Sequence, residues 1–433
     1  MLSTPIEMAI EVNPTSGVTN SENSRLWNLN FFLLWQGKLV SMVGDVAYGI
    51  ALGFWVLAVT GSTALMGTLM AASLLPRVII APFAGVWVDR GDRKWLIVLM
   101  DLIRGVFVVL VGAAALFGVI RIWMVFAAGV ALGICGAFFG PAVSSSIPDI
   151  VPKSRIVKAN SAFALVTTGA NVAGSSAGGF LFQVLGAPLM FLFNGISYLL
   201  SAISELFIKI PRISHPKEQF HFLEDLKSGL SFVWNHKGIR YVMFIASVLN
   251  FFASMGLMLL LPLFQRTEHL GAGLYGLLIG FFSGGAFAGF MLTSLVSVKS
   301  SRRFSLFYWC ALLFSVAMIF LPIYLFFPAM LALAIVAGLT NAVLNALFFS
   351  ILQLTVPQDK RGKVFGLLET LAGGLIPVAL AVGGILAEFL NLRLLISSCY
   401  FITFLCFVPM AFMPDIVKFI NFDPETEVPA GDN

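Results

Sequence analysis

The stretch GVWVDRGDRK, residues 85–94, separates two long apolar runs by a very short polar turn. The apolar run before it ends at Val88, and the next one begins at Trp95. The charged residues between them are Asp89, Arg90, Asp92, Arg93 and Lys94. Each flanking run is close to the roughly 20 apolar residues that cross a bilayer as a helix. The stretch therefore predicts a tight charged hairpin between two membrane-spanning helices.

The composition of the whole chain also points to a membrane. Of its 433 residues, 59% are hydrophobic and 11% are charged, whereas soluble domains carry about 25% charged residues. A chain this apolar cannot cover itself with polar surface, so we expect lipid to be its solvent. The cysteines lie inside apolar runs and the histidines outside them. We therefore expect no metal, no other cofactor and no need for a disulfide.

Apolar runs of membrane-spanning length recur along the chain and predict an all-α membrane protein. They are too long and too uniformly apolar for the strands of a β-barrel. The twelve predicted spans cover residues 29–58, 64–88, 95–118, 122–146, 159–185, 188–209, 239–264, 272–297, 304–325, 329–354, 363–389 and 393–414. Residues 1–27 lack the apolar core of a signal peptide, so we expect the first span to target the chain.

The loops between these spans carry Lys and Arg unequally. One set of alternate loops, together with the tails, holds most of them, whereas the other set holds Arg121, Arg266 and Arg393. Basic residues are enriched in cytoplasmic loops. We therefore predict a multi-pass protein of the cytoplasmic (inner) membrane, with residues 1–27 and 415–433 as cytoplasmic tails. This distribution explains the formal charge of +5 without nucleic acid as a partner.

The spans divide into two halves of six, in residues 28–210 and 239–414. Between them, residues 211–238 place apolar side chains at near-helical spacing among charged ones, which predicts an amphipathic helix on the cytoplasmic face; a plain linker is the alternative. The pairs Val151-Pro152 and Val356-Pro357 occupy equivalent places in the two halves, each followed by basic residues. Two related halves around a midplane site are one architecture of secondary transporters.

The hairpin resembles the signature Gly-x-x-x-Asp-Arg, followed by two bases, of the major facilitator superfamily. The matching residues are Gly85, Asp89, Arg90, Arg93 and Lys94, while Asp92 stands where the family usually has glycine. With Leu75-Pro76-Arg77 upstream, the sequence resembles the branch that contains macrolide efflux proteins and the enterobactin exporter. The resemblance covers about residues 28–414. It implies twelve helices in two pseudo-symmetric halves and transport by alternating access.

The fifth span resembles the exporter pattern of this superfamily in part. Gly174, Gly178 and Gly179 match its glycines, whereas Ala170 and Ser175 replace its first glycine and its proline. In the family this small-residue face seals the halves against each other; helix packing alone would also explain it. The fourth span lacks the embedded arginine that many drug–proton antiporters of the family use. Any transported proton must therefore be carried by other residues.

Charged residues inside the spans are candidates for proton coupling or substrate binding, since a charge at the bilayer centre costs about 2.5–3.5 kcal/mol. Asp45 and Arg77 lie about halfway along the first and second spans. Because these spans are antiparallel, we expect the two side chains at similar depth and in an ion pair. We hypothesise that Asp45 titrates and that Arg77 tunes it, with a static bridge as the alternative. Gln36 and Lys38 complete this candidate site.

A second charged group predicts a cytoplasmic gate. Asp101 and Arg104 are spaced to pair on one helix face. The predicted gate consists of Gly85, Asp89, Arg90, Arg93, Lys94, Asp101, Arg104 and Glu369. We expect the Asp89 carboxylate to favour the positive N-terminus of the eleventh span by about 0.3–1 kcal/mol. Glu205 and Glu388 lie near span ends, and we expect them to reach the membrane interface.

Together these features favour secondary active export of a small amphipathic molecule, such as a drug, a macrolide or a siderophore-like compound, driven by protons. The chain has no Gly-x-x-x-x-Gly-Lys-Ser/Thr loop for nucleotides and none of the clustered side chains that a membrane enzyme needs. The alternatives are import, lysophospholipid flipping and a receptor that does not transport. We expect a monomer. Five amides either line a cavity or join helices by hydrogen bonds: Asn171, Asn194, Asn250, Asn341 and Asn345.

Overall fold

The computed structural model describes residues 26–210, 230–231, 233–296, 298–356 and 364–423, and these contain helices and no strand. The first half, called the N-half below, holds α1 (Leu29–Thr60), α2 (Thr63–Arg90), α3 (Arg93–Leu116), α4 (Ile122–Ile150), η2 (Lys153–Arg155) and α5 (Ile156–Glu205). The second half, the C-half, holds α7 (Lys237–Arg266), α8 (Ala272–Leu295), α9 (Ser300–Phe320), α10 (Phe327–Thr355), η3 (Glu369–Gly373), α12 (Ile376–Phe389), α13 (Leu392–Phe407), η4 (Val408–Phe412) and α14 (Pro414–Ile420).

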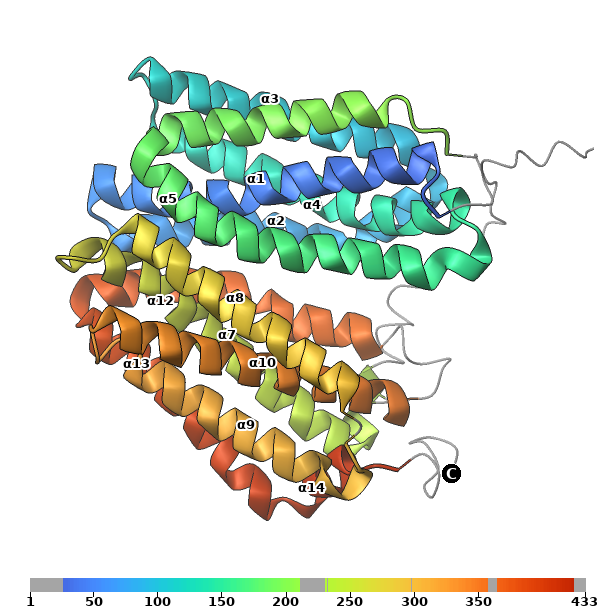
Figure 1. Cartoon of the computed structure of the whole chain (residues 1–433), viewed down its shortest axis with the longest axis vertical. Coiled ribbons are helices and arrows are strands. Elements are labelled where there is room, and N and C mark those ends of the chain that lie inside the picture. Colours follow the sequence, from blue (N-terminus) through green and yellow to red (C-terminus); the bar gives the residue numbers. More distant parts are fainter. Residues whose placement is uncertain (1–25, 211–229, 232, 297, 357–363, 424–433) are drawn as a thin grey trace, which may run out of the picture.

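Helix α5 contains two of the predicted spans. Among the described residues, 11 helices are long and apolar enough to cross a membrane, but α5 alone has 50 residues, about twice what one crossing needs. The backbone leaves the helix at Gly186, with φ 71° and ψ 172°. Glycine adopts this positive φ without steric cost, and Pro188 lacks the N–H that would continue the helix. The chain reverses there (Figure 1), so the predicted twelve spans are confirmed.

The charged hairpin is as tight as the sequence predicts. Helix α2 continues through Arg90 and α3 begins at Arg93, so two residues, Gly91 and Asp92, form the turn. The Asp92 Oδ1 atom accepts the backbone N–H of Trp95 at 3.4 Å. A side chain in this position satisfies an otherwise unpaired N–H of the first helical turn. This cap lets α3 begin inside the charged stretch, two residues before the predicted span.

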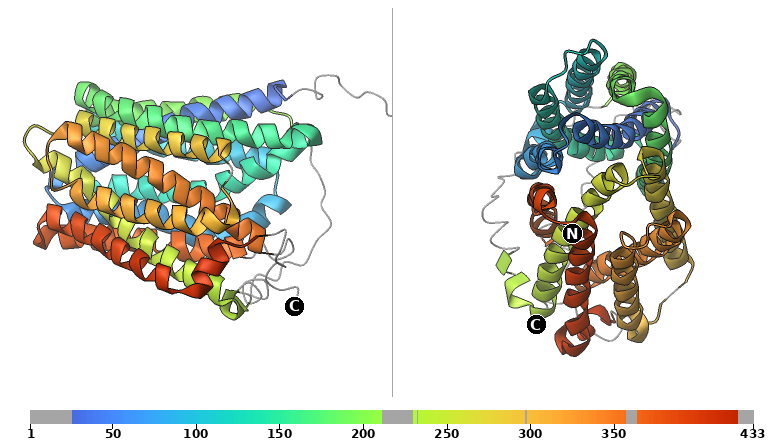
Figure 2. Two further views of the ribbon diagram at one scale, coloured as in Figure 1. Left: turned by 60° about the horizontal axis from the view of Figure 1, so that its bottom comes forward. Right: turned by 90° about the vertical axis from the view of Figure 1, so that its left-hand side faces the viewer.

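The two halves lie side by side and meet along two pairs of helices (Figures 1 and 2). Helix α2 of the N-half contacts α12, and α5 contacts α8. Each pair brings two glycines together, Gly67 with Gly384 and Gly179 with Gly276. A Cβ atom added to Gly179 would lie 2.1 Å from the carbonyl oxygen of Ala272. The approach of the halves therefore depends on the absence of side chains at these contacts.

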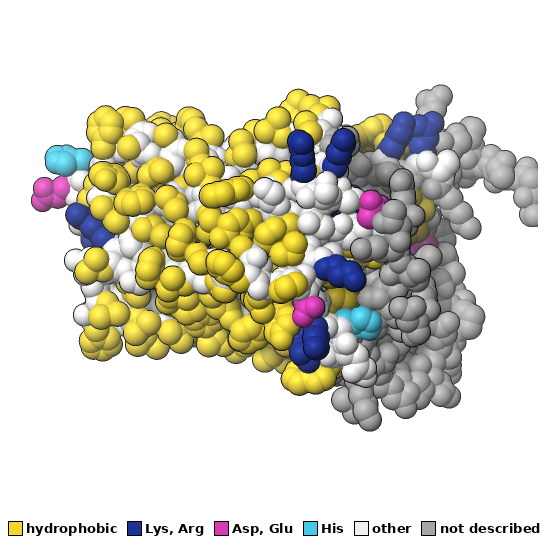
Figure 3. Space-filling model, turned by 90° about the horizontal axis from the view of Figure 1, so that it is seen from below, with side chains coloured by type: hydrophobic (Ala, Val, Ile, Leu, Met, Phe, Trp, Pro, Cys, Tyr) yellow, Lys and Arg dark blue, Asp and Glu magenta, His cyan; other side chains and the backbone are white. Residues whose placement is uncertain are grey.

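The two ends of the bundle differ in charge. One end, called the basic end below, carries Arg93, Lys94, Arg155, Lys209 and Arg303. Helix α1 begins there and α14 ends there, on the right in Figure 1. Apolar side chains cover the middle of the face in Figure 3, and most of the visible Lys and Arg side chains lie toward the basic end. The opposite end is called the far end.

Three hydrogen bonds between described residues join the halves at the far end. Oε1 of Glu388 accepts a hydrogen bond from Oγ of Ser62 at 2.6 Å and another from the backbone N–H of Ala64 at 3.0 Å. Nη2 of Arg266 donates to the carbonyl oxygen of Gly61 at 2.8 Å. Glu388 is exposed at this end, where the sequence placed it. The far end is therefore closed in this state.

The eleventh span is less regular than its apolar run predicts. Its described residues are helical from Val364, pass through the π-helical turn Glu369–Gly373 and continue as α12 from Ile376. Pro377 cannot donate a backbone hydrogen bond to the preceding turn. Such π-helical turns occur often at functional sites. The span therefore has a local break near its middle.

The start of the predicted C-terminal tail is folded. Helix α14 occupies residues that the sequence assigned to the tail from residue 415, and its Ile416 and Ile420 are buried. The segment after it is held to α9, because Nη1 of Arg303 donates to the carbonyl oxygen of Phe422 at 2.7 Å. The apolar i and i+4 spacing of the two isoleucines is the signal for this helix. Residues 211–229, most of the predicted amphipathic helix, lie outside the described residues.

Candidate functional site

Polar side chains form a buried network inside the N-half, between α1, α3, α4 and the second segment of α5. Its members are Lys38, Asp45, Asp101, Arg104, Asn194, Tyr198, Ser201 and Glu205. We call this set the N-half network. Glycines on α1 make room for it: a Cβ atom at Gly37 would lie 2.7 Å from Oγ of Ser201, and one at Gly44 would lie 2.5 Å from Oδ1 of Asn194. The polar face of α5 can therefore pack directly against α1.

Asp101 and Arg104 form the centre of the network. Their Oδ1 and Nη1 atoms are 3.2 Å apart, and the two side chains are 0% and 6% exposed. Nη2 of Arg104 also donates to the carbonyl oxygen of Cys135 at 3.2 Å, and its Cζ atom lies 4.2 Å from the centre of the Phe139 ring. The ion pair that the i, i+3 spacing predicts is confirmed. It lies buried among α1, α4 and α5, so the pair belongs to the N-half interior.

Replacing Arg104 with methionine should strongly destabilise the protein. The change keeps the bulk of the side chain but leaves the Asp101 carboxylate buried without its cation, which costs about 3–5 kcal/mol. We expect a clear fall in the melting temperature of the purified protein in detergent. The double variant Arg104→Met with Asp101→Leu removes both charges and should recover most of the loss. Equal melting temperatures for the natural protein and Arg104→Met would contradict this view of the pair.

Asp45 is half-buried and bonded to α5. The Tyr198 hydroxyl donates to Oδ1 of Asp45, and Nδ2 of Asn194 lies 3.5 Å from the same atom. Arg77, by contrast, is exposed on α2, with its Cδ 3.9 Å from the position of a Cβ atom at Gly136. The predicted Asp45–Arg77 ion pair is therefore wrong for this state. Similar depth in the membrane did not bring the two side chains together, because Asp45 faces α5 and Arg77 lies along α4.

The other two residues of the predicted coupling site differ in their surroundings. The ammonium of Lys38 lies 5.2 Å from the centre of the Phe139 ring. The guanidinium of Arg104 contacts the same ring. Lys38 therefore belongs to the N-half network through a cation–π contact. Gln36 is half-buried, and within the described part of the chain it has no hydrogen bond to the network.

Glu205 does not reach the membrane interface as expected, because it is 1% exposed. Its Oε1 atom accepts a hydrogen bond from Oγ of Ser201 at 3.2 Å. Its Oε2 atom and Oδ2 of Asp101 are both buried without a hydrogen-bond partner among the described residues. Sequence reasoning missed this residue. The signal was present in Asn194, Tyr198, Ser201 and Glu205, whose spacing of four, three and four residues places them on one helix face.

The predicted cytoplasmic gate is only partly described. Nη1 of Arg93 pairs with Oδ2 of Asp149 at 2.5 Å and donates to the carbonyl oxygen of Ser145 at 3.0 Å, so this base ties α3 to α4 within the N-half. Lys94 and Gly85 are half-buried. The side chains of Asp89, Arg90 and Glu369 lie outside the described residues, as does the start of the eleventh span. The contact of Asp89 with that span stays a prediction.

The three glycines of the fifth span serve two different surfaces. Gly174 and Gly178 face α1, where added Cβ atoms would lie 3.0 Å from Cβ of Val46 and 3.0 Å from Cα of Ala47. Gly179 faces α8 of the C-half. The proposed seal between the halves therefore rests on Gly179, and the other two glycines bring α5 against α1.

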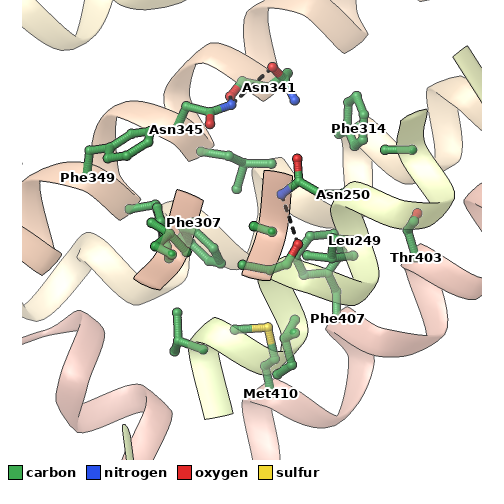
Figure 4. A pocket seen from close by; sticks show the side chains of 18 of the residues that line it. Leu249, Asn250, Phe307, Phe314, Asn341, Asn345, Phe349, Thr403, Phe407 and Met410 are labelled. Carbon is green, nitrogen blue, oxygen red and sulfur yellow. Dashed lines mark hydrogen bonds between the residues drawn. The ribbon is translucent and has the colours of Figure 1, made fainter. Parts of the chain in front are cut away.

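A pocket of about 350 Å³ lies inside the C-half, between α7, α9, α10, the π-helical turn and α13. Three of the five predicted amides, Asn250, Asn341 and Asn345, line it (Figure 4). The fourth, Asn194, joins two helices through Asp45. The fifth, Asn171, is exposed and donates to the carbonyl oxygen of Thr167 in its own helix.

Comparisons with known proteins agree with this architecture. A sequence family described as "Transmembrane secretion effector" matches residues 21–426. Macrolide efflux protein A of Streptococcus pyogenes is 21% identical over 84% of this chain and 90% of its own length. The multidrug efflux pump Tap of Mycobacterium bovis is 23% identical over 82% of this chain and 87% of its own.

The fold has solved counterparts. A bacterial homologue of the iron transporter ferroportin, in an inward-facing state, superimposes with a TM-score of 0.65 at 14% identity. The match covers 90% of this chain and 100% of that chain. The helical fold of this chain is thus one that a solved membrane transporter shares.

Proposed function

The chain belongs to the transmembrane secretion effector family of the major facilitator superfamily, and on that premise we propose that it exports a small amphipathic molecule in exchange for protons. The efflux names of its relatives support the direction of transport. The same relatives, one a macrolide pump and one a multidrug pump, support a drug-like substrate. Both halves of the fold lie in one chain, so a monomer suffices for this function.

The charge balance of the N-half network is the observation that carries proton coupling. Three carboxyl groups, Asp45, Asp101 and Glu205, share this region with two bases, Lys38 and Arg104. An ionised carboxylate without a cation is very costly in a buried site, and such a group takes up a proton instead. We therefore infer that the network holds one exchangeable proton when it is closed to water.

Glu205 is the group that we assign to this proton. Asp101 is paired with Arg104, and Asp45 accepts from Tyr198. Glu205 has one hydrogen bond, from Ser201, and an unpartnered Oε2 atom. It is also the last residue of α5, where the negative end of the helix dipole disfavours a carboxylate. Ser201 lies beside both Glu205 and Asp101, which supports proton movement between these two groups.

The state of the structure suggests how the proton drives export. We place the basic end in the cytoplasm, because basic loops are retained on that side, so closure of the far end makes this an inward-facing state. Release of the Glu205 proton to the cytoplasm would leave an unpaired buried carboxylate. That cost favours the outward-facing state, in which external water and a new proton reach the network. Substrate that binds in the inward-facing state is then carried outward.

Accumulation in a bacterium that lacks its own efflux pumps tests this function. Cells with and without the protein are loaded with erythromycin, chloramphenicol or ethidium, in the presence and absence of a protonophore. We expect lower accumulation of at least one compound in cells that carry the protein, and loss of that difference when the protonophore collapses the proton gradient. Equal accumulation for every compound would refute export, and export that persists with the protonophore would refute proton coupling.

A further inference from the structure

The pocket of the C-half has a lining that selects against charge. None of its described lining residues is acidic, basic or histidine. Five phenylalanines dominate it: Phe307, Phe314, Phe348, Phe349 and Phe407. A charged ligand would lose its hydration here and gain no counter-ion from the described lining residues, which is a large cost in an apolar site. The lining therefore favours an uncharged molecule, and the phenylalanine rings favour an aromatic one.

The amides of the pocket can bind both hydrogen-bond donors and hydrogen-bond acceptors of a ligand. Nδ2 of Asn250 donates to the carbonyl oxygen of Ala246 at 2.9 Å, and Nδ2 of Asn345 donates to the carbonyl oxygen of Asn341 at 2.9 Å. The Oδ1 atoms of Asn250 and Asn345 have no protein donor within the described residues, so both remain acceptors (Figure 4). Nδ2 of Asn341 likewise has no acceptor there and remains a donor.

The remaining polar side chain of the lining is already satisfied. The Thr403 hydroxyl donates to the carbonyl oxygen of Tyr400 at 2.7 Å and lies 3.3 Å from Oγ of Ser315. The three amides are therefore the groups left for a ligand. They come from α7 and α10, and Figure 4 shows them around one space. A few polar groups in an otherwise apolar cavity are typical of small-molecule sites.

One wall of the pocket belongs to the irregular eleventh span. Leu368, Ala372, Gly373 and Ile376 line it, and they flank or belong to the π-helical turn of the eleventh span. Further along the same span, Gly384 contacts Gly67 of the N-half. A molecule in the pocket would therefore touch a helix that takes part in closing the far end.

We propose that this pocket is the substrate site and that its substrates are compact, uncharged aromatic molecules that both donate and accept hydrogen bonds. The volume of about 350 Å³ lies near the lower end of the roughly 300–1,000 Å³ of ligand pockets, which favours molecules smaller than a macrolide ring. The assignment of the bound molecule as a transport substrate rests on the proposed export function. The binding specificity does not rest on it.

Equilibrium binding to the purified protein in detergent, without any proton gradient, tests the pocket by itself. The probes are radiolabelled chloramphenicol, which is uncharged and aromatic with hydroxyl and amide groups, and ethidium, which is aromatic with a permanent positive charge. We expect chloramphenicol to bind and ethidium to bind at least about tenfold more weakly, a difference of roughly 1.4 kcal/mol. Asn250→Leu removes one acceptor and should weaken chloramphenicol binding about tenfold.

Asn345→Asp should reverse the preference for chloramphenicol over ethidium, a result that misfolding of the variant could not produce. A carboxylate in the pocket should raise the affinity for ethidium and lower that for chloramphenicol. Asn171→Asp makes the same change on the exposed face of α5 and should alter neither affinity. Chloramphenicol binding that is the same in Asn250→Leu and Asn345→Asp as in the natural protein would overturn the proposal. So would ethidium binding that Asn345→Asp leaves unchanged. Because no transport is measured, these failures are distinct from a failure of export.

Discussion

Glu205→Gln is expected to abolish proton-driven export and to preserve exchange. Glutamine copies the shape of the protonated carboxyl group and keeps the hydrogen bond with Ser201, but it cannot release a proton. The variant should therefore stay folded and bind substrate, and it should still carry substrate in both directions. The assay uses proteoliposomes and the compound of the accumulation panel that shows the largest protonophore-sensitive export. Uptake driven by a pH gradient should fall to the level of empty liposomes, while counterflow of labelled compound should persist.

Two further carboxyl-to-amide variants show whether the effect is specific. Glu268→Gln changes an exposed residue of the far-end loop after α7 and should leave both assays unchanged. Asp45→Asn tests the hypothesis that the sequence suggests. If Asp45→Asn uncouples transport and Glu205→Gln does not, the proton belongs to Asp45. If neither variant alters gradient-driven transport, the N-half network is not the coupling site.

Gly179→Leu is expected to prevent closure of the far end. A Cβ atom at this position would lie 2.1 Å from the carbonyl oxygen of Ala272 and 2.8 Å from Cα of Gly276, so α5 and α8 cannot keep their contact. Overpacking of this kind costs about 1–3 kcal/mol, which shifts the populations of two states roughly 5- to 150-fold. The outward-facing state, in which the far end is open, should then dominate. Export should be lost because the inward-facing state is rarely reached.

Electron–electron distance measurements can follow this change directly. Spin labels replace Phe117 and Phe326, which are 81% and 69% exposed and lie at the far ends of the two halves, in a protein whose native cysteines are replaced. Gly179→Leu should lengthen the distance between the labels. Gly169→Leu, the same substitution in the same helix where a Cβ atom would meet no other atom within 4 Å, should leave the distance unchanged. Identical distance distributions for the two variants would refute the seal.

Hydropathy and the pattern of basic residues account for most of the architecture. The apolar runs predicted twelve spans, and even the merged helix α5 breaks at Gly186, next to the predicted boundary at residues 185–188. The spacing of Asp101 and Arg104 also sufficed for their ion pair, since residues three apart on a helix share a face. These features depend on the transfer of side chains into lipid and on positions along a single helix. Both are properties of local sequence.

The partners of the buried charges were decided by tertiary structure. Sequence position gives the depth of Asp45 in the membrane, but the direction in which it points depends on how α1 is rotated against its neighbours. The packing of Gly37 and Gly44 against α5 sets that rotation. It directs Asp45 toward Tyr198, leaves Arg77 on another surface and buries Glu205 instead of exposing it. The hairpin of residues 85–94 thus identified the fold, whereas the candidate proton site arises from contacts between helices that lie far apart in the sequence.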